Sequence, residues 1–344
     1  MNIPTSATGE QYLLQIRRNR WLLAVFGGLL VLLSLITLLI GRYPKAGLTP
    51  PSAIFNDALM RNIIVNVRLP RIILAVMAGA ILAGSGFVFQ MLFSNPLVEP
   101  GFLGVSQGAA FGAALVIIVA GYSTVLVQIS ATCFGLLALF LSYFLARHFR
   151  FGGWLLRLVL AGIAVSAIFS SGLAMLKLVA DPTRDLQDIT FWMMGGLWNS
   201  TWANTLSILP IVAVALVILI CYRWRLNVLS LNERTAHSVG LSPNRDKLIL
   251  LFIATVGTTV VISVTGLVGW IGLIIPHLAR RLFGADSRHA LPGSILMGAV
   301  FLLLCDTIGR TLLAGEIPLG LLTSIIGATI FIVILVQKRH GANL

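Results

Sequence analysis

Charged residues are scarce in this sequence of 344 residues: only 10% are Asp, Glu, Lys or Arg, while 58% are hydrophobic. A soluble domain has about 25% charged residues, so a water-exposed globule is excluded for most of the chain. Cysteine is equally rare, and Cys133, Cys221 and Cys305 lie singly in apolar runs without a CxxC partner, as small buried hydrophobic residues do. The phosphate-binding Walker A pattern is also missing, so we expect a protein that does not bind and split ATP by itself.

Long apolar runs recur between residues 21 and 336, and each approaches the roughly 20 residues that a membrane-spanning helix needs. They consist of Leu, Ile, Val, Ala and Gly, without the strict alternation of a transmembrane β-barrel. We therefore predict an all-α membrane protein, a single transmembrane domain over residues 1–344 with about ten helices. The predicted spans are 21–40, 72–92, 101–120, 124–146, 158–180, 203–222, 248–266, 268–279, 291–313 and 319–336.

The net charge of +13 comes from Lys and Arg residues that lie in short loops between the apolar runs. This distribution follows the positive-inside rule of membrane proteins and argues against nucleic-acid binding. It predicts that both termini, including the polar segment 1–20, are cytoplasmic. Basic loops flank the apolar stretch 248–276 on both sides, so the chain must cross and return within it, and we expect a break near residues 265–269.

One external loop does not follow the positive-inside rule. The first loop outside the membrane is basic, and topology alone does not explain why. Its cationic residues are Arg42, Lys45, Arg61, Arg68 and Arg71.

Residues 226–243 form a polar segment between two spans on the basic side, long enough for two short helices. Within it, Glu233, Ala236 and Gly240 match the Glu-x-x-Ala-x-x-x-Gly spacing of the cytoplasmic coupling loop of ABC importer permeases. The alternative is an ordinary capped surface helix, with Glu233 in its first turn and Gly240 as its stop.

Several longer strings resemble the FecCD family of ABC permeases, which includes permeases for vitamin B12, iron–siderophores and haem. The most specific are NPLVEPGFLG, from residue 95, and GLIIPHLAR, from residue 272, and the resemblance extends over residues 67–335. It implies a type II ABC importer permease fold in the bacterial inner membrane, surrounded by lipid. It also implies a homodimer, two cytoplasmic ATPase subunits that bind the ATP, a periplasmic substrate-binding protein, and no cofactor or metal in this chain.

Two positions depart from the family pattern. The family has Gly-Ala-Pro-Phe-Phe in its last helix, whereas this chain reads Gly327-Ala328-Thr329-Ile330-Phe331. Where the vitamin B12 permease has small hydroxyl residues near its cytoplasmic gate, this chain reads Gly152-Gly153-Trp154-Leu155. The second difference puts the chemistry of that gate, and with it the substrate, in doubt.

The resemblance also assigns roles to single residues. Arg68, Arg71 and Arg310 are expected at the outer mouth, where arginines of the family pair with glutamates of the binding protein. The alternative for each is an arginine that reaches from the membrane to the interface. Asn95 and Leu97 fall near an inner gate, although Asn-Pro is also ordinary turn chemistry.

The span 158–180 is rich in small residues, and the resemblance makes it the lining of the transport pathway. Gly162, Ser166 and Ser170 are its candidate pathway residues, although small residues serve close helix packing equally well. The substrate is expected to be a metal chelate, with an oxyanion such as molybdate as the alternative.

A rival reading is an ion-coupled secondary transporter, which would need acids or broken helices at membrane depth. Among the acids, we expect only Asp306 to lie deep enough, with Arg310 one turn later as its partner. A membrane enzyme would need a cluster of His, Asp or Cys at that depth, and the sequence shows none.

Overall fold

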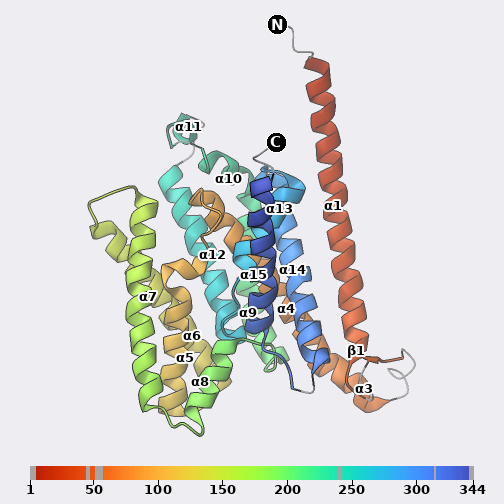
Figure 1. Cartoon of the computed structure of the whole chain (residues 1–344), viewed down its shortest axis with the longest axis vertical. Helices are drawn as coiled ribbons and strands as arrows, with labels where there is room; N and C mark the ends of the chain where they lie inside the picture. The colour runs from red at the N-terminus through yellow and green to blue at the C-terminus, as the bar shows by residue number, and fades with distance from the viewer. Residues whose placement is uncertain are drawn as a thin grey trace.

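The protein is almost entirely helical (Figure 1). The computed structural model describes residues 5–43, 47–50, 57–231, 233–238, 240, 242–313 and 315–340. The strands found there, β1 (Ile40–Gly41) and β2 (Gly47–Leu48), form one antiparallel hairpin in which Ile40 pairs with Leu48. The all-α prediction is confirmed.

Each predicted span coincides with a helix. These helices are α1 (Thr5–Leu39), α4 (Leu69–Leu92), α5 (Val105–Ala120), α6 (Thr124–His148), α7 (Trp154–Val179), α9 (Trp202–Cys221), α12 (Pro243–Thr265), α13 (Ile271–Phe283), α14 (Ser287–Leu312) and α15 (Leu319–His340). In the described chain, 7 helical segments are long and apolar enough to cross a membrane, whereas α5, α13 and the apolar part of α15, Leu319–Ile334, are shorter. The protein is thus a multi-pass membrane protein, and the count of about ten crossings stays a prediction.

Two helical units begin far ahead of the apolar runs that predict them. Helix α1 begins at Thr5 rather than at residue 21, because the polar segment before the apolar run continues the same helix. Helix α3 (Ala58–Ile63) and the π-helical turn η1 (Ile64–Arg68) lead without interruption into α4. The carboxylate of Asp57 starts this unit by accepting hydrogen bonds from the backbone N–H groups of Leu59 and Met60. The first external loop is therefore partly helical, and its Lys45 lies outside the described residues.

The predicted break between the seventh and eighth spans is confirmed. Helix α12 ends at Thr265 and α13 begins at Ile271. Gly266 has a φ of +66°, which a side chain would disfavour, and Trp270 has a φ of +72° despite its bulky side chain. Gly327 of α15 makes room for it, since a Cβ at Gly327 would lie 2.7 Å from the Cβ of Trp270.

The ends of the helices agree with the predicted topology. Helix α1 begins, and α15 ends, at the end of the bundle that carries the short helices α10 (Arg223–Leu229) and α11 (Glu233–Ser238) (Figure 1). Helix α8 (Asp185–Met194), whose first turn carries Asp185 and Asp188, lies at the opposite end with the β1–β2 hairpin (Figure 1). We call these two ends the coupling end and the outer end.

Helix α4 is the centre of the bundle and packs closely against α13 and α14. Gly79 of α4 meets Gly298 of α14 backbone to backbone, and Gly86 meets Gly272 of α13 in the same way. A Cβ on Gly79, Gly86 or Gly298 would overlap a backbone atom of the partner helix. Small residues are what allow helices to approach so closely within a membrane, where no hydrophobic force draws them together.

Substituting Gly298→Ala is expected to destabilise the protein by about 1–3 kcal/mol, because the added methyl group forces α4 and α14 apart. Gly28→Ala is the matched control, since nothing lies within 4 Å of that position on α1. There the change should be neutral or stabilising by about 0.5–1 kcal/mol. Thermal unfolding of the detergent-solubilised protein measures both, and equal effects would contradict the proposed contact.

Candidate functional site

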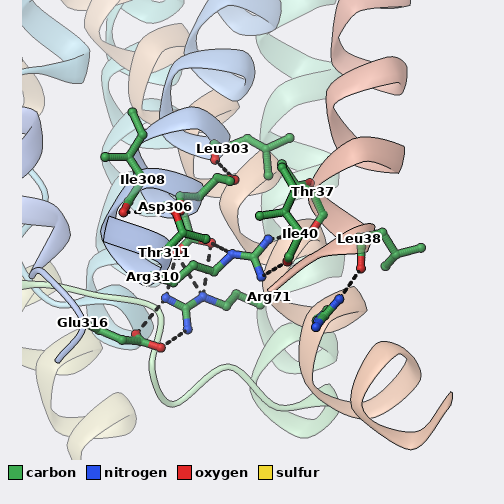
Figure 2. A network of polar contacts seen from close by, with 12 residues as sticks. Thr37, Leu38, Ile40, Arg71, Leu303, Asp306, Ile308, Arg310, Thr311 and Glu316 are labelled. Atoms are coloured by element: carbon green, nitrogen blue, oxygen red, sulfur yellow. Dashed lines mark hydrogen bonds and ion pairs between the residues drawn. The ribbon is translucent and has the colours of Figure 1, made fainter. Parts of the chain in front are cut away.

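A network of buried charges occupies the outer end, with Arg71 at its centre (Figure 2). The Arg71 guanidinium donates to Asp306 of α14 through Nε, at 2.9 Å, and lies 2.8 Å from it through Nη2. It also donates to both carboxylate oxygens of Glu316, each at 2.9 Å. Asp306 is 1% exposed, while the side chain of Glu316 is 37% exposed. One arginine thus joins α4, α14 and the segment that leads into α15.

Two further arginines close the carboxyl end of α1. Arg310 of α14 donates to the backbone oxygens of Thr37, at 2.6 Å, and Ile40, at 2.9 Å (Figure 2). Arg68 donates to the backbone oxygen of Leu38, at 2.8 Å. The last carbonyl groups of a helix have no partner within it and carry partial negative charge, so cationic donors stabilise this end. These bonds fasten α1 to the rest of the bundle.

The expected pairing of Asp306 with Arg310 is only partly right. The Nε of Arg310 is 3.9 Å from Asp306, whereas Arg71 makes short hydrogen bonds to it. The expected docking role of Arg68, Arg71 and Arg310 stays a prediction. A partner carboxylate would have to compete with the bonds that these side chains make within the chain. More accessible cationic side chains at the outer end belong to Arg42, Arg61 and Arg184.

The predicted coupling segment forms two short helices, α10 and α11, of which α10 begins three residues before residue 226. Glu233 is the first residue of α11, and Ala236 packs inward with 1% exposure. Gly240 follows the helix with a φ of +80°, and its N–H donates to the backbone oxygen of His237. The glycine therefore stops the helix as the spacing suggested. Leu231, between the two helices, is 57% exposed.

Helix α10 is bonded to two long helices. The side chain of Asn227 donates to Asp286 at 2.7 Å and accepts from the N–H of Ser287 at 2.8 Å. Both partners lie at the start of α14. Arg225 forms an ion pair of 3.1 Å with Asp246 in the first turn of α12. These bonds attach α10 to the start of α14, whose other end carries Asp306 and Arg310.

Asp286 caps α14 and remains ionised at any physiological pH. Partial burial alone would raise the pKa of its carboxyl group, but hydrogen bonds from Arg288 and Asn227 outweigh this effect and lower the pKa to about 2. A lowered carboxyl pKa contributes stability that is present above the ordinary aspartate value and lost as the pH falls towards 2. The link between α10 and α14 is thus independent of pH near neutrality.

The candidate gate residues lie in an exposed turn after α4. The side chain of Asn95 accepts a hydrogen bond from the N–H of Leu97 at 2.9 Å, and both residues are exposed. This bond is the turn chemistry that Asn-Pro favours. A gating role for the two residues stays a prediction.

Helix α7 divides its small residues between two surroundings. Gly162 is buried against η2 (Pro100–Leu103), where a Cβ would lie 2.8 Å from the Cα of Leu103. Ser166 is half-buried and Ser170 is exposed in the single chain. Gly162 thus has a packing role, and Ser166 and Ser170 are the residues left available to a pathway.

Sequence reasoning missed Glu99, which lies inside the bundle. After α4 ends at Leu92, the chain turns back and brings Glu99 beside Leu82, in the middle of α4, and Gly272, at the start of α13. Asp306 is therefore not the only acid at membrane depth, and the expectation that it is the only one is wrong. The available signal was an acid flanked by Val98 and Pro100 in an otherwise apolar segment.

The sequence matches the model of the FecCD transport family over residues 29–337. The chain is 38% identical to the molybdate import system permease protein MolB of Haemophilus influenzae, over 92% of this chain and 95% of that protein. It is 36% identical to the hemin transport system permease protein HmuU of Yersinia pestis, over 91% of this chain and 94% of that protein.

A solved structure agrees with these relatives. It is described as an inward-facing conformation of a metal-chelate type ABC transporter and is 37% identical in sequence. The match covers 92% of this chain and 98% of that one, with a TM-score of 0.85. The similarity therefore extends to the whole arrangement of helices.

Proposed function

Because the chain belongs to the FecCD transport family and is a permease subunit of an ABC importer, we propose that it carries a metal chelate across the bacterial inner membrane. Two copies would line the pathway, with cytoplasmic ATPase subunits at the coupling end and a substrate-binding protein at the outer end. The coupling segment supports this assembly, because α10 is bonded to α12 and α14 and α11 lies at the tip of the coupling end (Figure 1).

The single observation that favours a chelate as cargo is the surface of α7. Between Arg157 and Lys177 this helix has no charged residue, and its exposed side chains there are small or apolar. Ala164, Ala167 and Ser170 are among them. An oxyanion in transit would need cationic or N–H donors, whereas a bulky chelate with an organic periphery fits a smooth apolar lining.

Molybdate remains the second candidate, because MolB of Haemophilus influenzae is as similar to this chain as the haem permease. The experiment that separates the two is stimulation of ATP hydrolysis in proteoliposomes by binding protein loaded with haem, a ferric siderophore, cobalamin or molybdate. Stimulation by one of the chelates supports the proposal. Stimulation by molybdate alone would assign the oxyanion, and the surface of α7 would then not decide selectivity.

A binding protein that docks on the three outer arginines must compete with the bonds that these side chains make within the chain. A carboxylate of the docked binding protein could replace Glu316 on Arg71, since Glu316 is the more exposed of its two partners. Docking would then release Glu316 from Arg71. The segment before α15 would have one state with the Arg71–Glu316 pair and a second state without it, and docking would favour the second.

A further inference from the structure

A cavity of about 180 Å³ lies inside the bundle, between the returning segment after α4 and helices α12 and α13. Its polar side chains are Glu99, Ser106 and Thr258, and the rest of the lining is apolar or glycine. Thr258 belongs to the middle of α12, and Leu82 of the lining to the middle of α4. The cavity is thus at membrane depth.

Glu99 points its carboxylate towards glycine on two sides of this cavity. One carboxylate oxygen lies 3.1 Å from the position that a Cβ would take on Gly272, and the other lies 3.6 Å from that position on Gly101. The Ser106 hydroxyl lies 3.2 Å from the same point beside Gly101. In the part of the chain that the structure describes, the carboxylate has no ion pair or hydrogen bond.

Thr258 supplies an independent sign of a ligand. Its side chain is 3% exposed, and its hydroxyl oxygen makes no hydrogen bond within the described residues. Neighbouring threonines of α12 differ: Thr255 and Thr259 each donate to the backbone oxygen four residues earlier. Thr258 instead keeps its hydroxyl group beside the cavity, and an unmade buried hydrogen bond costs about 1–3 kcal/mol.

The carboxylate of Glu99 is unpaired and the residue is half-buried at this depth, where an uncompensated charge is costly and a counter-charge stabilises it. A proton on the carboxylate would neutralise it without using the surrounding hydroxyl oxygens. A cation would use them, since carboxylate and hydroxyl oxygens are ligands of hard cations. One carboxylate balances a single positive charge. The described residues contain no cluster of three or more His, Cys, Asp or Glu of the kind that holds transition metals.

We propose that this cavity binds one alkali-metal cation, with the carboxylate of Glu99 and the hydroxyl groups of Ser106 and Thr258 as ligands. The volume leaves room for some water beside the ion, since a water molecule occupies about 30 Å³ in the liquid. The bound ion joins the returning segment to α12. It is a resident ion of the permease and does not require an ion gradient.

The test uses the purified full chain in nanodiscs and radioactive sodium as the probe, with potassium and lithium as competitors and choline as the inert salt. Saturable binding of one sodium ion per chain is expected, with a higher unfolding temperature in sodium than in choline. Glu99→Gln should abolish binding. Asp181→Asn, which changes an exposed acid between α7 and α8, should leave it unchanged.

A second variant keeps the proposal testable if Glu99→Gln does not fold. Thr258→Val keeps the shape of the side chain and should weaken sodium binding about tenfold, as the loss of about one ligand's free energy predicts. Sodium binding that persists in Glu99→Gln would overturn the proposal. So would the absence of saturable binding by the wild-type chain, including the case in which only pH alters its stability. None of these results depends on the transported substrate.

Discussion

Replacing Arg71 with methionine is expected to destabilise the folded protein by about 3–5 kcal/mol, because Asp306 is left buried and charged without its main partner. Glu316 should contribute little to this loss, since water can solvate it once Arg71 is gone. Denaturant or thermal unfolding of the isolated chain in detergent measures the effect.

The matched control is Arg61→Met, an exposed arginine at the same end, which should change stability by less than about 0.5 kcal/mol. Combining Arg71→Met with Asp306→Leu should restore much of the stability, because neither buried charge then remains. If Arg71→Met leaves the isolated chain as stable as the wild type, the network is not structural. A defect seen only with the binding protein would then favour the docking role alone.

Substituting Leu231→Asp is expected to weaken association with the ATPase subunit at least about tenfold and to stop ATP-driven transport. Leu231 is an exposed apolar side chain between α10 and α11, and burying an unpaired carboxylate in an interface costs about 2 kcal/mol or more. Co-purification with the ATPase and hydrolysis in proteoliposomes measure the two effects.

Phe151→Asp serves as the control, since Phe151 is 55% exposed in the loop between α6 and α7, outside the coupling segment. It should leave association with the ATPase intact. Equal loss in both variants would mean that the contact is not confined to α10, α11 and their connection. Intact association in Leu231→Asp would remove this segment from the interface.

The helices could be predicted from the sequence because each depends on local hydropathy. The break after Thr265 was also predictable, because basic loops on both sides required a return and glycine supplied the place for it. The stop of α11 at Gly240 followed from the conformational freedom of glycine. The early start of α1 was not predictable, because its first turns are polar and hydropathy measures only the membrane-embedded part.

The functional contacts were harder to predict because they join distant parts of the chain. Arg71 and Asp306 are separated by 235 residues, and spacing within one helix had favoured Arg310 as the partner of Asp306 instead. Arg68 reaches Leu38 by a return of the chain that no local pattern indicates. Glu99 was overlooked because a turn between two spans was expected to lie at the membrane surface, whereas this one folds back into the bundle.

The central claim is that this chain transports only when ATPase subunits drive it from the coupling end. The most direct measurement is uptake of the substrate into proteoliposomes that contain this chain, its ATPase subunit and its binding protein, with and without ATP. The account predicts uptake that requires ATP and is lost in Leu231→Asp, with no response to an imposed sodium or proton gradient. Uptake by the chain alone, driven by such a gradient, would contradict it.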